Sequence, residues 1–556
     1  MLAHIAAPVL RAETRTTPLV RLASGDEAVG WAALDAGIRF AASYPGTPAS
    51  DVLEWLFEHA DPALVRNVWS VNEKVAYESA LAVAMAGQRS LVALKHVGLN
   101  VAADAFVSSC YSGVRAGFVV LVADDPGCHS SQNEQDSRHY RQLAHTLLLE
   151  PSDAQEAYAM TREAFRLSER FELPVMVRLT TRTAHGCRPV TAEAPEGPRG
   201  EAAWPKDPGR FLLVPTVSRA LHRRLAGLQD ALAQTVHESR FTEERRCVGP
   251  RGSRRGVLCS GVGFALAEEY AEDADGLLKI PGAPFPDRVL ASFLSAHDEV
   301  LVLEEGDPWW EDRARALARG ATEVRGRLSG HLSRTGELRP EEVQAALRGE
   351  PCLPSTLSAA PPRLPEICQG CGYHQVFGAL ADIPGLATPS DIGCNTLGGL
   401  PPYRVMDSNL AMGSSIGMAC GLAAVGVKKI VAILGDSTFF HSGIPPLIEA
   451  VRQGLQLTVL ILDNGTTAMT GGQDVPHTHS KDPRMGRVDL EACVRSLGVA
   501  SCTVFDPHRL GRDGIRALVE EQLAAPRVNV LLYRSPCLLY SPGYGRSPAT
   551  QGGRPA

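Results

Sequence analysis

Two strand-like segments near the end of the chain stop at residues that could bind a metal ion. The apolar run 431–435 is followed by Asp436 and Ser437. The next apolar run, 457–463, is followed by Asn464, twenty-eight positions after Asp436. Mg²⁺ prefers oxygen ligands and usually combines a few protein groups with phosphate oxygens. The spacing therefore predicts a site for Mg²⁺ and a diphosphate, in preference to an ordinary strand–helix–strand unit with polar ends.

Neighbouring residues would complete this predicted site. Gly435 lets the backbone turn tightly after its strand, and the backbone carbonyl of Thr466 could be a third ligand. The segment AMGSSIGMACG, residues 411–421, is a small-residue helix. Its start near Gly413 would let the backbone approach a diphosphate closely, and tight helix packing is expected to explain its other small residues.

Elements that could position these residues recur along the chain. Buried strands are predicted at 90–96 and 117–125, and a helix at 72–87. The last part of the chain, 367–545, alternates in the same way. Strands that alternate with helices predict doubly wound parallel sheets, with binding loops at the carboxyl ends of the strands. We therefore expect an α/β fold with two such domains and a smaller α/β domain between them.

Composition shifts suggest the boundaries of these parts. The smaller domain contains Gly261-Val262-Gly263, which without a third glycine is weak evidence for dinucleotide binding and is better explained by packing. Pro-rich and Gly-rich stretches mark linkers. The predicted order is an α/β domain at 1–190, a linker with an amphipathic helix at 191–250, the smaller domain at 251–350, a linker at 351–366, the α/β domain at 367–545 and a tail at 546–556.

Bulk composition excludes several classes of protein. The 556 residues carry a net charge of -7, which argues against a nucleic-acid surface. No run of apolar residues is long enough for a membrane span, and the N-terminus does not resemble a signal peptide. The odd number of cysteines, 13, does not suggest a disulfide framework. These features predict a cytoplasmic protein.

The segment G-D-S…D-N-G-T around Asp436 and Asn464 resembles the thiamine-diphosphate motif, in which G-D-G or G-D-S precedes an Asn by 25 to 30 residues. Its continuation, DNGTTAMTGGQ, is similar to the large (alpha) subunits of indolepyruvate ferredoxin oxidoreductases, a branch of the 2-oxoacid:ferredoxin oxidoreductases. Further segments with this similarity are YPGTPASDVLEWL (44–56), WSVNEKVAYE (69–78), EPSDAQEAY (150–158), PVMVRLTTRTAHG (174–186), LEEGDP (303–308), DIGCNTLG (391–398) and AMGSSIGMACG (411–421).

The resemblance implies roles for residues that would be unremarkable alone. Glu73 matches the acid that hydrogen-bonds the aminopyrimidine of the coenzyme, although a lone Glu at a helix start is usually only a favourable dipole interaction. The coenzyme would then lie between the first and last domains. Gly46, Thr47 and Pro48 would contact the thiazolium or the substrate carboxylate. The other residues matched to cofactor binding are Gly413, Gly435, Asp436, Ser437, Asn464, Thr466 and Met469.

Cys368 and Cys371 form a C-x-x-C pair, which alone is ambiguous between zinc, redox and iron–sulfur chemistry. The resemblance implies that they bind a [4Fe–4S] cluster together with Cys394 and Cys537; zinc and free thiols are the alternatives. The resembled subunits usually continue into a ferredoxin-like tail, whereas no cysteine follows Cys537 here. Electrons are therefore expected to leave through a single cluster, with the acceptor left open.

The resemblance implies oxidative decarboxylation of an arylpyruvate, of the indolepyruvate or phenylpyruvate type, to an aryl-acetyl-CoA. Thiamine diphosphate, Mg²⁺ and coenzyme A would take part. The expected partners are a small beta-type catalytic subunit and an electron acceptor or electron-transfer subunit, in a twofold hetero-oligomer. Two alternatives are a non-oxidative thiamine-dependent decarboxylase and a catalytically silent subunit. His185, His374 and His441 could approach the pocket, but each is more often a structural histidine.

Overall fold

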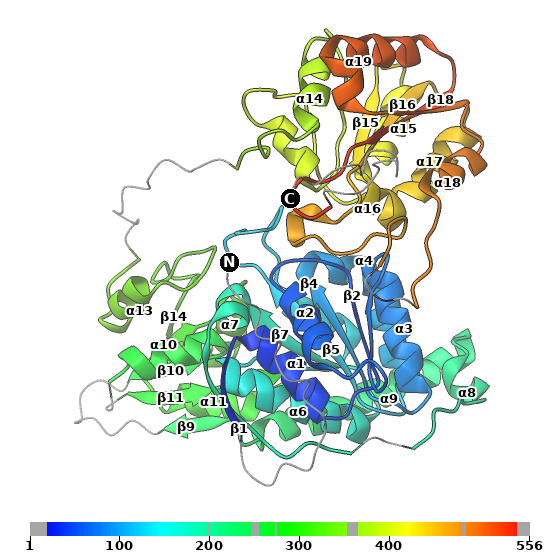
Figure 1. Cartoon of the computed structure of the whole chain (residues 1–556). Coiled ribbons are helices and arrows are strands. Elements are labelled where there is room, and N and C mark those ends of the chain that lie inside the picture. Colours follow the sequence, from blue (N-terminus) through cyan, green and yellow to red (C-terminus); the bar gives the residue numbers. More distant parts are fainter. Residues whose placement is uncertain are drawn as a thin grey trace, which may run out of the picture. The chain divides into compact units, whose positions relative to one another are not determined.

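Residues 1–358 and 359–556 form two units of the computed structural model, here called unit 1 and unit 2 and described separately (Figure 1). The predicted tail at 546–556 and most of the predicted linker at 351–366 lie outside the residues that the structure describes. No helix among the described residues is long and apolar enough to cross a bilayer. The structure describes residues 19–197, 200–245, 255–272, 275–352, 365–480, 482 and 484–541.

The larger sheet of unit 1 contains β2 (Phe40–Ser43), β3 (Arg66–Trp69), β4 (Ser90–Lys95), β5 (Phe118–Asp124), β6 (Leu147–Leu149), β7 (Val175–Thr180) and β12 (Gly282–Ala283). Their order in the sheet is β12-β6-β7-β5-β4-β2-β3, and only the β12–β6 pair of this sheet is antiparallel. The strands predicted at 90–96 and 117–125 are confirmed as β4 and β5. Because β2 to β5 run parallel, their carboxyl ends share one edge of the sheet.

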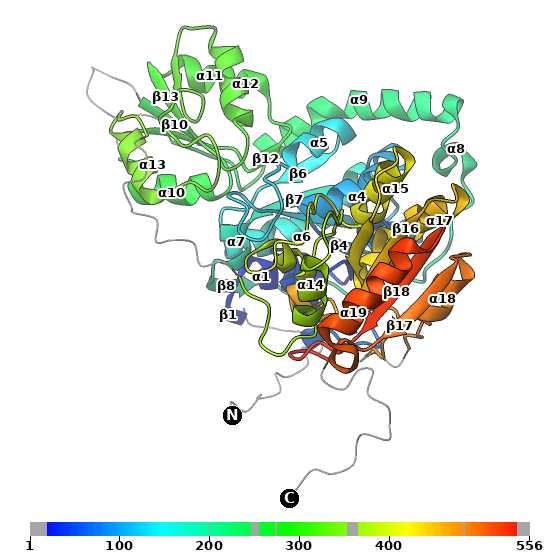
Figure 2. The same ribbon diagram turned by 90° about the horizontal axis from the view of Figure 1, so that it is seen from above.

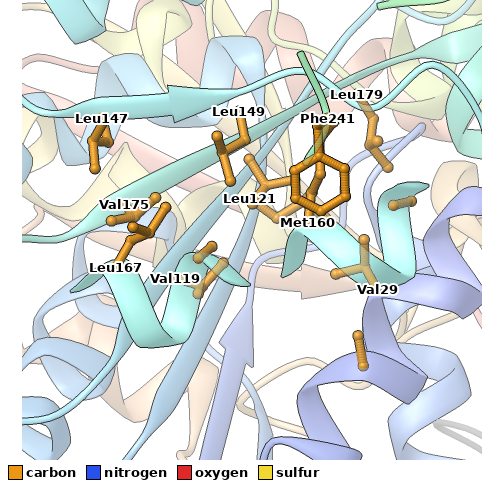
Figure 3. Packing of buried hydrophobic residues seen from close by; sticks show 14 of the residues in the cluster. Val29, Val119, Leu121, Leu147, Leu149, Met160, Leu167, Val175, Leu179 and Phe241 are labelled. Atoms are coloured by element: carbon orange, nitrogen blue, oxygen red, sulfur yellow. The ribbon is translucent and has the colours of Figure 1, made fainter. Parts of the chain in front are cut away.

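Helices cover both faces of this sheet, because alternate residues of a buried strand point to opposite sides. The helices near it are α1 (Gly25–Asp35), α2 (Ser50–His59), α3 (Glu73–Met85), α4 (His96–Ser112), α5 (Arg138–Ala144), α6 (Ala154–Phe171) and α7 (Thr181–His185). Val119 and Leu121 of β5 pack in a cluster with α1, α2 and α6. Figure 3 shows them in this cluster with Met160 of α6. Val120 and Val122 pack against α3 and α4.

The remaining elements of unit 1 are β1 (Leu19–Ala23), β8 (Arg188–Ala192), α8 (Pro208–Phe211), α9 (Pro215–His237), β9 (Glu243–Arg245), β10 (Arg255–Cys259), α10 (Val262–Tyr270), β11 (Gly276–Lys279), α11 (Asp287–Ser295), β13 (Glu299–Leu303), α12 (Trp309–Ala318), β14 (Glu323–Arg325) and α13 (Pro340–Leu347). A smaller sheet has the order β14-β13-β10-β11-β9. A side chain at Gly263 would overlap the carbonyl of Leu303, so this glycine lets α10 lie against β13. That contact supports packing as the reason for Gly261-Val262-Gly263.

Unit 2 is a parallel α/β unit built from α14 (Tyr373–Ala381), α15 (Ser414–Ala424), β15 (Val431–Gly435), α16 (Asp436–Thr438), α17 (Ile444–Arg452), β16 (Leu457–Asp463), α18 (Leu490–Ser496), β17 (Ser501–Phe505), α19 (Pro507–Ala524) and β18 (Val528–Arg534). The strand order is β15-β16-β18-β17, with every pair parallel. Helices α14 and α19 pack on one face, and α15, α17 and α18 on the other (Figure 2). The expected fold class is therefore confirmed.

Candidate functional site

Asp436 and Asn464 lie at neighbouring strand ends in unit 2. The parallel strands β15 and β16 pair with Gly435 opposite Leu462, so the residues after them emerge at the same edge of the sheet. The backbone N–H of Gly465 donates a hydrogen bond to Asp436 Oδ2 at 2.8 Å. The structure thus brings together the two stretches that the sequence analysis paired.

The loop after β16 folds back onto these strand ends. The backbone N–H of Thr466 donates to Asn464 Oδ1 at 3.0 Å, and the buried Thr466 hydroxyl donates to the carbonyl of Gln473 at 3.0 Å. A carboxylate, an amide oxygen and loop carbonyls are therefore close to one another. These are the ligand types that Mg²⁺ prefers, so the residues present fit a magnesium ion. We call Asp436, Asn464 and Thr466 the strand-end site.

Two residues that the sequence analysis did not select adjoin this site. His477 Nε2 lies 2.9 Å from Asp463 Oδ1 and 3.3 Å from Asp436 Oδ2, and all three side chains are buried. Burial acts to lower the pKa of His477, but hydrogen bonds and charge from the two carboxylates raise it to about 9. Burial of Asp436, in contrast, raises the pKa of its carboxyl group, and the hydrogen bond from His477 opposes that shift. Because His477 stays protonated at neutral pH, its imidazolium holds the Asp436 carboxylate in place.

The other predicted cofactor contacts of unit 2 are more dispersed. Gly413 has a φ of 83° and directly precedes α15, and a side chain there would meet Ser442. Ser437 is buried, and its Oγ accepts a hydrogen bond from the Thr467 hydroxyl at 3.1 Å. Met469 is 51% exposed and so lies on the surface of unit 2.

The packing explanation for the small residues of the helix at 411–421 is wrong for two of them. An added side chain at Gly417 or Gly421 would meet no atom of the described chain within 4 Å. Both glycines lie on the outward side of α15, whereas Ile416 and Ala419 face the core. Sequence alone does not distinguish these two sides of a helix made almost entirely of small residues.

Four cysteines gather near the strand-end site; we call Cys368, Cys371, Cys394 and Cys537 the cysteine group. Burial, together with negative charge on Cys537, Cys371 and Cys368, raises the pKa of Cys394 to about 12. Burial likewise raises the pKa of Cys371 to about 11. These thiols are therefore near enough to interact electrostatically, although they come from three separate segments of the chain.

The spacing of the sulfur atoms bears on what the cysteine group could bind. A tetrahedral zinc site with Zn–S bonds of about 2.3 Å requires sulfurs about 3.8 Å apart. Within the described part of the chain, no three of these sulfurs lie within 4.8 Å of one another. The sulfurs are therefore not placed as in a tetrahedral zinc site, and a [4Fe–4S] cluster bound by these four cysteines stays a prediction.

Tyr373 connects the cysteine group with the strand-end site. Asn464 Nδ2 donates to the Tyr373 hydroxyl at 3.2 Å. Burial raises the pKa of Tyr373, and the nearby charges that add to this shift include those of Cys394, Asp436 and Cys371. The backbone N–H of Cys537 also donates to the carbonyl of Asn464 at 2.9 Å. The two groups are therefore adjacent parts of one site within unit 2.

Glu73 opens α3 at the carboxyl end of β3 in unit 1. Its neighbour Asn72 caps the helix by accepting a hydrogen bond from the Val75 N–H at 2.9 Å. Glu73 is only 6% exposed. A side chain on Gly98 of α4 would lie 2.7 Å from Glu73 Cγ and Oε1, so this glycine makes room for the acid. The joint action of Glu73 and Asp436 on one coenzyme stays a prediction.

Gly46, Thr47 and Pro48 form the turn between β2 and α2, at the same edge of the unit 1 sheet. The Gly46 N–H donates to Ser50 Oγ at 2.8 Å, and the Thr47 carbonyl accepts from the Ser130 hydroxyl at 3.1 Å. Helix α2 begins at Ser50, with no side-chain cap at the preceding residue. The turn is therefore held by hydrogen bonds with the start of α2 and with the loop that contains Ser130.

The three candidate histidines all have partners within their own units. His185 Nδ1 lies 3.7 Å from Asp51 Oδ2. His374 bonds the Tyr403 hydroxyl at 2.6 Å. The remaining contacts are His374 Nε2 with the Cys368 carbonyl at 3.2 Å and His441 Nδ1 with Ser442 Oγ at 2.6 Å.

Two families of known sequences match parts of this chain. Residues 31–216 match "Pyruvate flavodoxin/ferredoxin oxidoreductase, thiamine diP-bdg", and residues 391–530 match "Thiamine pyrophosphate enzyme, C-terminal TPP binding domain". The first segment contains Glu73, and the second contains the strand-end site. Both matches are to families that bind thiamine diphosphate.

Curated relatives match almost the whole chain. The indolepyruvate oxidoreductase subunit IorA of Methanothermobacter thermautotrophicus is 40% identical over 543 residues, covering 93% of this chain and 87% of the relative. The subunit of the same name from Thermococcus kodakarensis is 36% identical, covering 94% and 86%. A solved 2-oxoglutarate:ferredoxin oxidoreductase from Magnetococcus marinus aligns with a TM-score of 0.49 at 16% identity, over 59% of this chain and 65% of that chain.

Proposed function

Because the chain belongs to the family of indolepyruvate oxidoreductase IorA subunits, we propose that it catalyses the oxidative decarboxylation of an arylpyruvate to an aryl-acetyl-CoA. The observation that carries this proposal is the contact, through Tyr373 and Asn464, between the strand-end site and the cysteine group. A coenzyme for decarboxylation and an acceptor for the released electrons would then be neighbours.

Unit 2 would hold the diphosphate end of the coenzyme. Asp436, Asn464 and the Thr466 carbonyl would bind Mg²⁺, which in turn binds phosphate oxygens. Gly413 would admit the diphosphate to the start of α15, where backbone N–H groups favour anions. Thiamine diphosphate, when bound, supplies the electron sink that lets a 2-oxoacid lose carbon dioxide.

Unit 1 would act on the aminopyrimidine and the substrate. Glu73 would hydrogen-bond a ring nitrogen of the aminopyrimidine and hold the proton there, which favours the tautomer that acts as a base. The turn at Gly46, Thr47 and Pro48 would border the thiazolium and the substrate. The overall change is balanced: an arylpyruvate and coenzyme A give an aryl-acetyl-CoA, carbon dioxide, a proton and two electrons.

The cysteine group would bind one [4Fe–4S] cluster that takes these electrons one at a time. A beta-type subunit and an electron acceptor would complete the enzyme, since the relatives named above are subunits. If the cluster were absent, the same chain could release an aldehyde as a non-oxidative decarboxylase. The position of the cysteine group beside the strand-end site favours the oxidative reaction.

An Asp436→Asn variant tests the magnesium assignment. We expect thiamine diphosphate with Mg²⁺ to bind about 100-fold more weakly, because the amide lacks the charge that attracts the cation. Isothermal titration of the anaerobic protein measures this affinity. The control is Asp513→Asn, since Asp513 is an exposed residue of α19. Unchanged affinity in Asp436→Asn would reject the assignment.

A Gly98→Ala variant tests whether Glu73 needs its present position. The new methyl group would press on Glu73, and we expect turnover of an arylpyruvate to fall at least tenfold. The higher helix propensity of Ala should offset part of the stability lost to overpacking. The control is Gly227→Ala in α9, where an added methyl group meets nothing within 4 Å of the described chain. Steady-state kinetics and thermal unfolding distinguish a displaced Glu73 from a damaged fold.

The decisive experiment is anaerobic purification of this chain with its partner subunits, followed by an assay of coenzyme A-dependent dye reduction. Indolepyruvate and phenylpyruvate should both be tested as substrates. Dye reduction that requires coenzyme A supports the oxidative reaction. Release of aldehyde without dye reduction would support the decarboxylase alternative, and a complex that never takes up thiamine diphosphate would support a silent subunit.

A further inference from the structure

Lys95 is a buried cation at the edge of the unit 1 sheet that also carries Glu73. It is the last residue of β4, immediately before α4, and is 8% exposed. Its ammonium donates a hydrogen bond to the carbonyl of Ser130 at 2.7 Å. No carboxylate oxygen of the described residues lies within 4.0 Å of this ammonium. A buried charge without an ion-pair partner is costly, and such groups concentrate at functional sites.

The surroundings of Lys95 hold the side chain in place without neutralising it. A side chain on Gly46 would lie 3.1 Å from Lys95 Cβ and 3.5 Å from its Cδ, so this glycine accommodates the aliphatic stem. The Ser130 hydroxyl donates to the Thr47 carbonyl at 3.1 Å, which ties the loop under the ammonium to the same turn. Lys95 is therefore packed beneath the turn at Gly46 and Thr47.

The acid whose charge acts most strongly on Lys95 is Asp125, which already accepts hydrogen bonds from other donors. Asp125 accepts hydrogen bonds from the backbone N–H of Ser130 at 2.8 Å and from the hydroxyl of Thr181 at 2.9 Å. Burial lowers the pKa of Lys95, and the charges of Asp125 and Cys128 offset only part of this effect, so that the pKa is about 8. At neutral pH most Lys95 side chains are therefore still protonated and carry a positive charge. An ammonium has three N–H donors, and the described chain gives it one acceptor.

Lys95 directly precedes the helix turn that packs against the predicted catalytic acid. Gly98, three residues further along α4, borders Glu73. The first turn of α4 adds backbone N–H groups beside Lys95, and these groups also favour an anion. A small anionic group at the end of β4 would contact the Lys95 ammonium, the backbone N–H groups at the start of α4 and the turn at Thr47.

We propose that Lys95 binds the carboxylate of the 2-oxoacid substrate and so selects for acids over neutral carbonyl compounds. This assignment rests on the proposed function, because that function supplies a substrate with one permanent negative charge. Coenzyme A is the other anionic reactant, and its phosphates are the alternative that the experiment must exclude. The carboxylate is the better match, since it brings a single charge to a single buried ammonium.

The test compares a charged ligand with a neutral one. In the anaerobic complex loaded with thiamine diphosphate and Mg²⁺, the dissociation constants of indole-3-lactate and its amide are measured by titration calorimetry. We expect the wild-type protein to prefer the acid about 30-fold, because charge-assisted hydrogen bonds are the strong ones. In Lys95→Met this preference should fall below about threefold, and Lys95→Arg should restore part of it.

Kinetics and stability give independent readouts. Lys95→Met should raise KM for indolepyruvate at least tenfold while leaving KM for coenzyme A unchanged. Its Tm should be unchanged or higher, because the substitution removes a desolvated charge. Lys206→Met is the matched control, since Lys206 is an exposed lysine of unit 1, and should behave as wild type.

The possible failures are distinguishable. A Lys95→Met protein that still prefers the acid, or whose KM rises for coenzyme A instead, would overturn the Lys95 assignment and leave the proposed function intact. A Tm lowered together with an unchanged preference would show that Lys95 is only structural. A wild-type complex that binds thiamine diphosphate but neither converts an arylpyruvate nor binds indole-3-lactate would overturn both.

Discussion

A Glu73→Gln variant should keep thiamine diphosphate bound and lose turnover by about a thousandfold, within the range for loss of an acid–base group. Gln has nearly the size of Glu and can still hydrogen-bond a ring nitrogen, but it cannot exchange a proton there. Because Glu73 sits against Gly98 with little free space, an isosteric replacement is the appropriate change. The measurements are arylpyruvate-dependent dye reduction and the thiamine diphosphate content of the purified protein.

The matched control for this experiment lies in the same helix. Glu78 is an exposed residue of α3 that pairs with Lys74, and Glu78→Gln should leave turnover within twofold of wild type. A Glu73→Gln protein with unchanged turnover would remove the catalytic role of this acid. Loss of the coenzyme together with turnover would instead assign Glu73 to binding.

A Cys394→Ser variant should lose the broad visible absorption of the cluster, and dye reduction should fall at least 100-fold. Cys394 is a half-buried thiol, and negative charge on each of the other three cysteines raises its pKa. Serine has nearly the same size but does not provide the soft thiolate that iron–sulfur clusters require. Iron content, the visible spectrum and dye reduction are measured on anaerobic protein.

The coenzyme should remain bound in this variant, because Cys394 provides no ligand to the strand-end site. We expect thiamine diphosphate affinity within threefold of wild type, and any residual decarboxylation should release an aldehyde. The control is Cys493→Ser in α18, a half-buried cysteine outside the cysteine group. Normal iron content and normal dye reduction in Cys394→Ser would reject the cluster assignment.

The links within unit 2 would couple the two proposed cofactor sites. Asn464 contacts Tyr373 through its side chain and Cys537 through its backbone carbonyl. The side chain and the backbone of one residue thus belong to two proposed sites. Metal binding at Asn464 would therefore also position one of the cluster cysteines.

Much of the fold and part of the candidate site could be predicted from sequence. Continuous apolar runs such as those of β4 and β16 are typical of strands buried on both faces, and each ends at a polar residue. Parallel strands present their carboxyl ends at one edge, so the meeting of Asp436 with Asn464 follows from the order of strands and helices. Glu73 and the four cysteines could be recognised because each lies in a short sequence motif that resembles the family, although the cysteines come from three separate segments.

Only the tertiary structure identified His477, Tyr373 and Lys95. Their surroundings depend on chain segments that are distant in sequence, such as the 91 positions between Tyr373 and Asn464. A lone histidine, tyrosine or lysine is common in any sequence, and nothing local shows whether it is buried beside a carboxylate or left without one. Sequence therefore determined which groups stand at the strand ends, while folding decided which charges they meet, because burial and electrostatic partners are properties of the packed chain.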